Sequence, residues 1–316
     1  MRSRDPDRAA CPACGGELAA WLSVPASEPS RAGERFALWR CVSCGSAVTA
    51  GEPEPELHDS GAYRPGVPRL HRAALPLLRV FDDQRLALLR TLAPPGARVL
   101  DVGAGQGRFV ARARAGGYDA AGIEPAGRGL QRAAILGAPV TQSTIEQAEI
   151  APGSLDAVTL WHVLEHLVDP GAALERIASW CKPGGGLLVG VPNLASLQAQ
   201  IAGAHWYHLD VPRHRTHFTP AGLRTLLDAS GFRVVGARHT LLEHNPYGMW
   251  QSVLNLVTEH PSYLFNLLKR NAPLRSWDLA LTALALPLAP LAALAELAAG
   301  LTGRGGTVAV LARRHG

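Results

Sequence analysis

Two pairs of cysteines have the spacing of a metal site. They lie in CPACGG at 11–16 and CVSCGS at 41–46, and a glycine follows each pair. Such turns let two thiolates and nearby backbone N–H groups converge on one ion. The pattern predicts a structural zinc ion held by Cys11, Cys14, Cys41 and Cys44, with no open position for catalysis. ELAAWLSVP and RFALWRC, between the pairs, are expected to form the strands of a ribbon.

A glycine-rich segment, VLDVGAGQGRF, has the pattern of a nucleotide-binding turn. Gly103, Gly105 and Gly107 follow an expected strand and precede an expected helix. Glycine permits positive φ and a close approach of the backbone to a ligand, and the N–H groups at the start of the helix point to the same place. Glu124 ends the next strand in GIEP, where its carboxylate can accept hydrogen bonds from two ribose hydroxyls.

The ribose contact fits both a nicotinamide dinucleotide and S-adenosylmethionine, and Asp101 favours the second. Asp101 lies two residues before the first glycine. A pyrophosphate bound there would place its negative charge beside the Asp101 carboxylate, and both charges would be removed from water. A methionine ammonium could instead be reached through a water molecule or a backbone amide.

The surrounding elements predict a parallel α/β sheet. Apolar strand-type runs at 97–105, 119–125, 138–145, 155–161, 187–193 and 232–239 alternate with helical patterns. Thr219 and Pro220 have the types expected at the N-cap and first position of a helix. Right-handed crossovers would place ligands at the carboxyl ends of the strands.

Changes in residue composition and hydrophobic pattern along the chain predict five regions. These are a zinc ribbon at 1–50, a linker or N-terminal arm at 51–78, a core at 79–244, an apolar helical insert at 245–303 and a closing strand at 304–316.

Several of these motifs together resemble a known family, the class I S-adenosylmethionine-dependent methyltransferases. The resemblance is carried by VLDVGAGQGRF, GIEP, STIEQAEIAPGSLDAVTLWHVLEHLVDP and WCKPGGGLLVGVPN. It is greatest to the branch with ubiquinone-type O-methyltransferases and enzymes that tailor sugars and lipids. It implies a Rossmann-like sheet with helices on both faces, S-adenosylmethionine as cofactor, and methyl transfer to an oxygen of a small-molecule, sugar or lipid-linked acceptor.

The resemblance also implies roles for particular residues. Asp101 and the three glycines would line the methionine and sugar of the cofactor, and Glu124 would bind the ribose. Thr144 and Ile145 would lie at the adenine, although the family often has an acidic residue where Thr144 stands. Trp161 and His162 would lie beside the sulfonium.

A hydroxyl nucleophile needs a base or a metal to take its proton. His162 and the histidine-rich block WYHLDVPRHRTHFTP supply candidates, with His214 and His217 the first choice in the block for base or substrate-orienting groups. The alternative is that these histidines only hydrogen-bond the loop into place.

The string HVLEH at 162–166 has two interpretations. It fits the HxxEH of a zinc protease, but that site needs a long helix and Asp169-Pro170 ends this segment early. In ubiquinone-type enzymes an acidic residue and a Glu-His pair here can hold a divalent ion. His162 occupies the acidic position, and the alternative is that Glu165 and His166 anchor the local structure.

An uncharged run at 279–295 contains Pro287 and Pro290, and KRNAPLRSW precedes it. We expect a helical hairpin that caps the active site or touches a membrane surface; a full membrane span is the third alternative.

The net charge of +5 is scattered, and residues 1–50 carry six arginines against five acidic residues. An RNA methyltransferase guided by the ribbon is therefore a weaker alternative; a nicotinamide oxidoreductase and a non-catalytic cofactor-sensing protein are two more. The N-terminus has no apolar signal-type segment, so we expect a cytoplasmic protein, or one peripheral to the inner face of the membrane.

Overall fold

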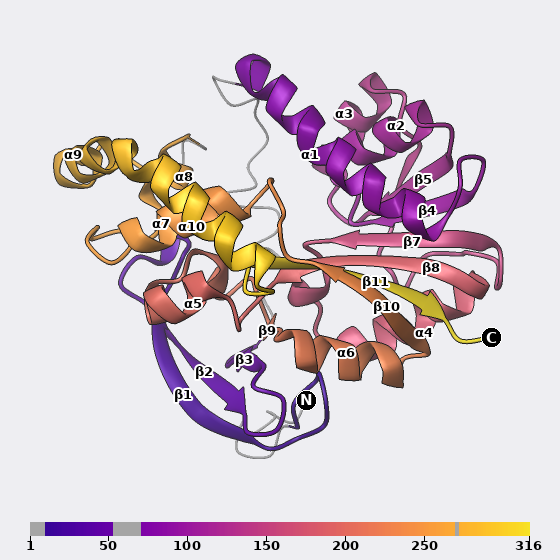
Figure 1. Cartoon of the computed structure of the whole chain (residues 1–316), viewed down its shortest axis with the longest axis horizontal. Coiled ribbons are helices and arrows are strands. Elements are labelled where there is room, and N and C mark those ends of the chain that lie inside the picture. Colours follow the sequence, from indigo (N-terminus) through magenta and orange to yellow (C-terminus); the bar gives the residue numbers. More distant parts are fainter. Residues whose placement is uncertain (1–9, 53–70, 269–271) are drawn as a thin grey trace. The chain divides into compact units, whose positions relative to one another are not determined.

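A computed structural model describes residues 10–52, 71–268 and 272–316, coloured along the chain in Figure 1. The chain divides into two compact units, one of Met1–Arg72, Pro192–Leu223 and Arg238–Val308, and one of Ala73–Val191, Arg224–Ala237 and Ala309–Gly316. Most of the predicted linker at 51–78, together with Lys269 and Arg270, lies outside the described residues.

The second unit contains a seven-stranded sheet of order β10-β11-β8-β7-β4-β5-β6. The pairs β4–β5, β4–β7, β5–β6 and β7–β8 are parallel. The strands are β4 (Arg98–Val102), β5 (Asp119–Glu124), β6 (Val140–Gln142), β7 (Leu155–Trp161), β8 (Cys181–Pro192), β10 (Phe232–Arg238) and β11 (Thr307–Arg314). Long stretches of β7 and β8 are fully buried, as parallel strands covered on both faces require. This confirms the predicted α/β fold.

Helices lie along both faces of this sheet. They are α1 (His71–Leu92), α2 (Arg108–Ala115), α3 (Leu130–Ile135) and α4 (Pro170–Trp180). Figure 1 shows α1, α2 and α3 on one side and α4 on the other. Asp169 caps α4 by accepting a hydrogen bond from the Ala172 backbone N–H at 3.0 Å, with Pro170 at the first position.

The first unit contains a four-stranded sheet of order β1-β2-β3-β9. All three neighbouring pairs are antiparallel. Strands β1 (Leu18–Pro25) and β2 (Arg35–Cys41) are the predicted ribbon strands, and β3 (Ala47–Thr49) follows. The fourth strand, β9 (Thr216–His217), comes from the histidine-rich block. Residues 192–223 therefore group with the N-terminal ribbon, which differs from the predicted core at 79–244.

The remaining helices are α5 (Leu197–Ala202), α6 (Pro220–Ala229), α7 (Asn245–Leu254), α8 (Tyr263–Leu268), α9 (Ser276–Ala285) and α10 (Ala289–Leu301). Thr219 caps α6 as predicted, since its hydroxyl accepts from the Gly222 N–H at 3.1 Å. A 3-10 turn, η9 (Leu286–Leu288), joins α9 to α10. The uncharged run at 279–295 thus lies within one helical run, Ser276–Leu301, and does not form a hairpin. Among the described residues it alone is long and apolar enough to cross a membrane.

Candidate functional site

The glycine turn between β4 and α2 has the predicted backbone. Gly103, Gly105 and Gly107 have φ values of 71°, 53° and 71°. A Cβ at Gly103 would lie 2.3 Å from a methyl carbon of Val163, and one at Gly107 would lie 2.8 Å from the Cβ of Ala133. No atom lies within 4 Å of a Cβ built at Gly105. The outer glycines are therefore required by packing, whereas Gly105 borders open space where a ligand can approach.

Glu124 holds this turn from the end of β5. One carboxylate oxygen accepts from the Gly105 N–H at 2.9 Å, and the other accepts from the Ala126 N–H at 3.0 Å. Each oxygen has a second lone pair. The carboxylate can therefore bind the turn and still accept hydrogen bonds from a diol.

Asp101 is buried at 3% exposure and has partners within the chain. Its carboxylate forms an ion pair with Arg85 of α1 and accepts a hydrogen bond from the Thr159 hydroxyl at 2.6 Å. Burial raises the pKa of Asp101, and the Arg85 charge and the Thr159 hydrogen bond act against that rise. Neither Arg85 nor Thr159 was among the predicted site residues.

Arg85 connects three elements at the turn. Its guanidinium carbon lies 3.7 Å from the ring centroid of Phe109 on α2 and 5.2 Å from that of Trp161 at the end of β7. One turn earlier on α1, both carboxylate oxygens of Asp82 accept from Arg108 Nε, at 3.0 and 2.8 Å. Two ion pairs from one helix thus hold both ends of the glycine turn.

One feature of the sequence indicates the two ion pairs made by α1. Asp82 and Arg85 are three residues apart on the face of α1 that also carries the buried Leu86 and Leu89. Charges on an otherwise apolar helix face need partners when they are buried.

Thr144 and Ile145, for which the resemblance predicts an adenine contact, lie just after the end of β6. The Thr144 hydroxyl accepts from the Gln147 N–H at 3.3 Å. Ile145 is buried, and its carbonyl accepts from Arg176 Nε at 2.8 Å. The Ser143 N–H donates to the Glu124 carbonyl at 3.2 Å, which connects this segment to the glycine-turn side of the sheet.

Trp161 and His162 follow one another at the end of β7. A Cβ at Gly190 would lie 2.6 Å from the Trp161 ring, so the strand beneath the ring must carry glycine. His162 has a φ of 55°, which is rare for a residue other than glycine and is concentrated at functional sites. Its Nδ1 lies 3.0 Å from a carboxylate oxygen of Glu165.

The HVLEH string does not lie on a long helix. Leu164–His166 form a three-residue 3-10 turn, η6, and the scaffold that a zinc protease needs is not present in this described segment. Glu165 is 1% exposed, and its pairing with His162 orients that imidazole.

His214 and His217 belong to the first unit, and both are buried. His217 Nε2 lies 2.9 Å from the Thr49 hydroxyl of β3, and His214 Nδ1 lies 2.8 Å from the His208 carbonyl. Burial and the neighbouring His214 lower the pKa of His217 to about 3. His217 is therefore neutral near pH 7 and bonded within the sheet, which favours the structural alternative for this histidine.

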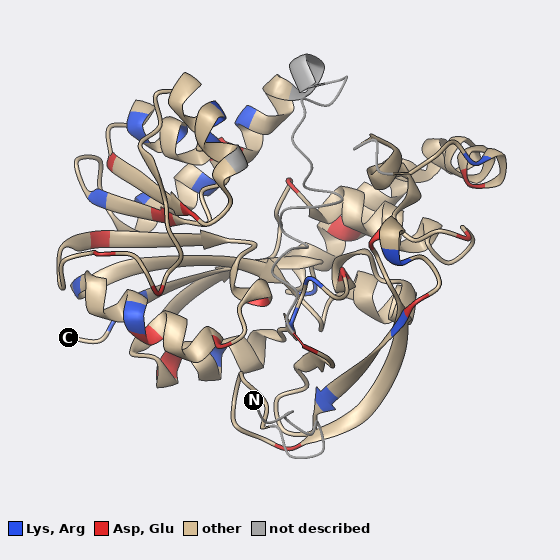
Figure 2. Cartoon of the chain, turned by 180° about the vertical axis from the view of Figure 1, so that it is seen from behind, with Lys and Arg blue, Asp and Glu red and all other residues tan. Residues whose placement is uncertain are grey.

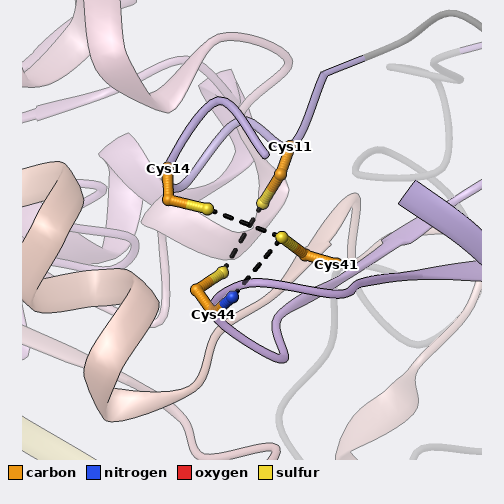
Figure 3. A group of neighbouring side chains, drawn as sticks. All are labelled: Cys11, Cys14, Cys41 and Cys44. Carbon is orange, nitrogen blue, oxygen red and sulfur yellow. Dashed lines mark hydrogen bonds between the residues drawn. The ribbon is translucent and has the colours of Figure 1, made fainter. Parts of the chain in front are cut away.

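The four ribbon cysteines converge as predicted (Figure 3). Their sulfurs lie within 4.8 Å of one another, with Cys11–Cys44 at 3.7 Å and Cys14–Cys41 at 3.5 Å. A tetrahedral zinc with bonds of about 2.3 Å separates its sulfurs by roughly 3.8 Å. Burial raises the pKa of Cys11 and of Cys14. At Cys41, burial is outweighed by the backbone N–H groups of Cys44 and Ser43 and by the neighbouring thiols, which lower the pKa to about 7. The set fits four-thiolate zinc coordination.

Comparisons with known proteins agree with this geometry. A family model described as a methyltransferase domain matches residues 72–237, more than half of the chain. The ubiquinone biosynthesis O-methyltransferase of Xanthomonas campestris pv. campestris (strain B100) is 37% identical over 136 residues, which cover 40% of this chain and 57% of that protein. The protein of that name from Albidiferax ferrireducens is 31% identical over 211 residues, which cover 62% of this chain and 82% of that protein.

Among solved structures, the [4+2]-cyclase SpnF matches with a TM-score of 0.50 and 19% identity, over 74% of this chain and 80% of that one. That likeness concerns the fold alone. The match to the Xanthomonas relative spans little more than half of that relative's length. The family model and the Albidiferax relative, together with the parallel sheet and its glycine turn, show that this chain belongs to the methyltransferase-domain family, with the class I fold.

Proposed function

We propose that this protein transfers a methyl group from S-adenosylmethionine to an oxygen of a small-molecule, sugar or lipid-linked acceptor. The observation that carries the proposal is the open side of Gly105, whose N–H donates to Glu124, within the segment that the family model matches. The names of the O-methyltransferase relatives support oxygen as the acceptor atom.

The cofactor, when bound, supplies a methyl group on a cationic sulfur, and the protein supplies alignment. In this proposal the Gly103–Gly107 backbone and Asp101 bind the methionine part, the latter through a water molecule or backbone amide. Glu124 binds the ribose, Thr144 and Ile145 border the adenine, and Trp161 borders the sulfonium. Arg85 acts as a positioning residue, because it holds both Asp101 and the Trp161 ring.

The acceptor hydroxyl loses a proton as the new C–O bond forms and the C–S bond breaks, so a base is required. His162 is our candidate, because Glu165 orients its imidazole and its backbone conformation is strained. His214 and His217 are proposed to orient the substrate-side loop, His217 through its bond to Thr49.

The four cysteines are proposed to hold a structural zinc ion that stabilises the ribbon. A closed set of four thiolates has no position for substrate, so no catalytic role follows from it. Positions of Lys and Arg and positions of Asp and Glu both occur along the described ribbons of each unit (Figure 2), which gives no support to the RNA alternative.

We propose that the protein is cytoplasmic. Its proposed partner is a small-molecule, glycan or lipid-linked substrate. A lipid-linked acceptor would bring the protein to the inner face of a membrane, with contact through 269–301.

Calorimetry with S-adenosylhomocysteine and with NAD tests the cofactor. We expect binding of the first and none of the second. Gly105→Ala should weaken S-adenosylhomocysteine binding at least about tenfold, because the added methyl group enters the open side of the turn and strains a positive φ.

Gly153→Ala is the matched control. Gly153 also has a positive φ, of 62°, and no atom within 4 Å of a built Cβ, but it precedes β7, at the opposite edge of the parallel sheet from the turn. Equal loss of affinity in both variants, or binding of NAD in place of the thioether, would overturn the proposed cofactor site.

A further inference from the structure

The helical run Ser276–Leu301 has its polar residues inside and its apolar residues outside. It is 26 residues long, and its most apolar 18-residue window has a mean hydropathy of 1.8 with only 17% of that window buried. Asp278 and Glu296 are its only charged residues, and they are 1% and 2% exposed. This is the reverse of a helix that packs an apolar face onto a protein core.

Hydrogen bonds fix the polar side against the rest of the first unit. Asp278 accepts from the Glu259 N–H at 2.9 Å and lies 2.8 Å from His260 Nδ1. Glu296 accepts from Gln198 Nε2 at 3.0 Å and from the Gly306 N–H at 2.6 Å. The two carboxylates lie near opposite ends of the run, so it cannot roll to bury its other side.

The outward side is a face of leucines without charge. We call it the leucine face. Its members are 49–76% exposed: Leu284, Leu286, Leu288, Leu291, Leu294, Leu297 and Leu301. Contiguous exposed apolar surface of this kind marks an interaction site.

Both ends of the run carry groups suited to a membrane surface. Trp277, at 59% exposure, and the exposed Arg275 stand at its start, and the exposed Arg304 follows its end. Aromatic rings and basic side chains at the borders of an apolar helix are typical of the headgroup region. The arginines are complementary in charge to anionic lipids.

We infer that the leucine face docks into the surface layer of an anionic lipid bilayer, with the run lying in the membrane plane. A crossing orientation would carry Asp278 and Glu296 into hydrocarbon and break their four hydrogen bonds, which is costly. A second copy of the chain fits less well, because protein interfaces carry a hydrogen-bonding rim and the leucine face has no such groups within 284–301. One part of the inference rests on the proposed function: if the acceptor is lipid-linked, the protein would take it from the same bilayer.

Vesicle flotation of the full chain tests this inference. Vesicles of phosphatidylcholine with and without phosphatidylglycerol are the probes. We expect the protein to float with the anionic vesicles, and Leu291→Glu with Leu294→Glu to reduce the bound fraction at least about tenfold. Both leucines are 62% exposed, so the substitutions leave the packed side intact.

The matched control adds the same two charges at exposed apolar residues of the second unit, Ile135→Glu with Val235→Glu. This variant should float like the unaltered protein. Absence of flotation in the unaltered protein, or equal loss in both variants, would overturn the inference. So would a dimer that the leucine substitutions dissociate in the absence of vesicles.

S-adenosylhomocysteine binding, measured on the same samples, separates this inference from the proposed function. An unaltered protein that binds S-adenosylhomocysteine but does not float with the vesicles counts against membrane docking alone. Vesicle binding without cofactor binding counts against the proposed function alone.

Discussion

At the scale of single residues, the arrangement around Arg85 is the most consequential one. A buried guanidinium forms an ion pair with a buried carboxylate and lies between two aromatic rings at the base of the glycine turn. Removing one member of such a pair is far more costly than removing both, because the remaining charge stays desolvated.

Arg85→Met should therefore destabilise the protein by about 3–5 kcal/mol, measured by urea unfolding. Adding Asp101→Asn should restore part of that loss. Arg112→Met is the control, since Arg112 pairs with Asp83 at the surface, where such pairs contribute about 0–1 kcal/mol. A loss at Arg85 no larger than that at Arg112 would show that the buried pair does not hold the turn.

His217 gives a prediction about pH. Its pKa is about 3 in the folded state against an ordinary value of 6.5, so the unfolded chain binds a proton that the folded chain refuses. The folded state should lose stability, by on the order of a few kcal/mol, as pH falls from about 6.5 toward 3. His217→Gln should flatten this slope, most visibly between pH 6.5 and 5 in unfolding titrations.

The exposed His205 supplies the comparison for loss of an imidazole. His205→Gln should leave the slope close to that of the unaltered protein. An unchanged slope in His217→Gln would contradict the buried, neutral state of this side chain.

The sequence predicted those site features that depend on local chain geometry. The glycines and Glu124 were predictable, because a strand, a tight turn and the end of the next strand follow within a few residues of one another. The sequence marks Arg85 as a charge that needs a partner, but neither its pairing with Asp101 nor the role of Thr159 was predictable, since Asp101 lies 16 and 58 residues from them. Only packing of α1 and β7 against β4 brings the three together.

At the scale of elements, Glu296 decides how firmly α10 is held. Burial raises the pKa of its carboxyl to about 7, against an ordinary value of 4.5, while the Gly306 and Gln198 hydrogen bonds oppose the rise. The folded chain therefore keeps a proton that the unfolded chain loses. Stability should fall by on the order of 3 kcal/mol as pH rises from 4.5 to above 7.

Glu296→Gln removes the titrating group and should remove this fall. Thermal unfolding at pH 5 and pH 8 measures it, and the difference between the two midpoints should shrink in the variant. Glu34→Gln, at an exposed position of the first unit, is the control and should leave the difference unchanged. If the difference between the midpoints shrinks equally in both variants, the pH dependence does not come from the buried Glu296 carboxyl.

The predicted elements were confirmed where hydrophobic pattern alone determines them, as in β4, β5, β7 and the ribbon strands. The hairpin was wrong for a local reason. Pro287 and Pro290 suggested a break, but each lies in the first positions of a new helical turn, where no backbone N–H is needed. The helix therefore continues through both prolines.

At the scale of the whole molecule, the grouping of 192–223 with the ribbon could not be predicted. It depends on packing of Leu194, Trp206 and Val211 against Val24 and Leu38, about 170 residues earlier in the chain. Periodicity within a window carries no information about contacts at that separation.

The zinc prediction concerns the whole molecule, because the ribbon strands share one sheet with β9, which lies far along the chain. Purified protein should contain one zinc per chain by elemental analysis, and Cys44→Ser should lose it and lower the thermal midpoint. Cys181→Ser should retain the ion, since Cys181 lies at the start of β8 in the other unit. Protein without zinc, or Cys44→Ser with full occupancy, would contradict the assignment.

The pairing of β3 with β9 has a consequence for synthesis on the ribosome. Ala47 pairs with His217 and Val48 with Thr216, so this edge of β3, which ends at Thr49, is fully paired only after 168 further residues have been made. At about 5–20 residues per second that interval is roughly ten to thirty seconds. During it an open strand edge is exposed to other nascent chains. The last of the four ribbon cysteines, Cys44, has already emerged by then, so early capture of zinc would keep the half-built sheet in register until its final strand arrives.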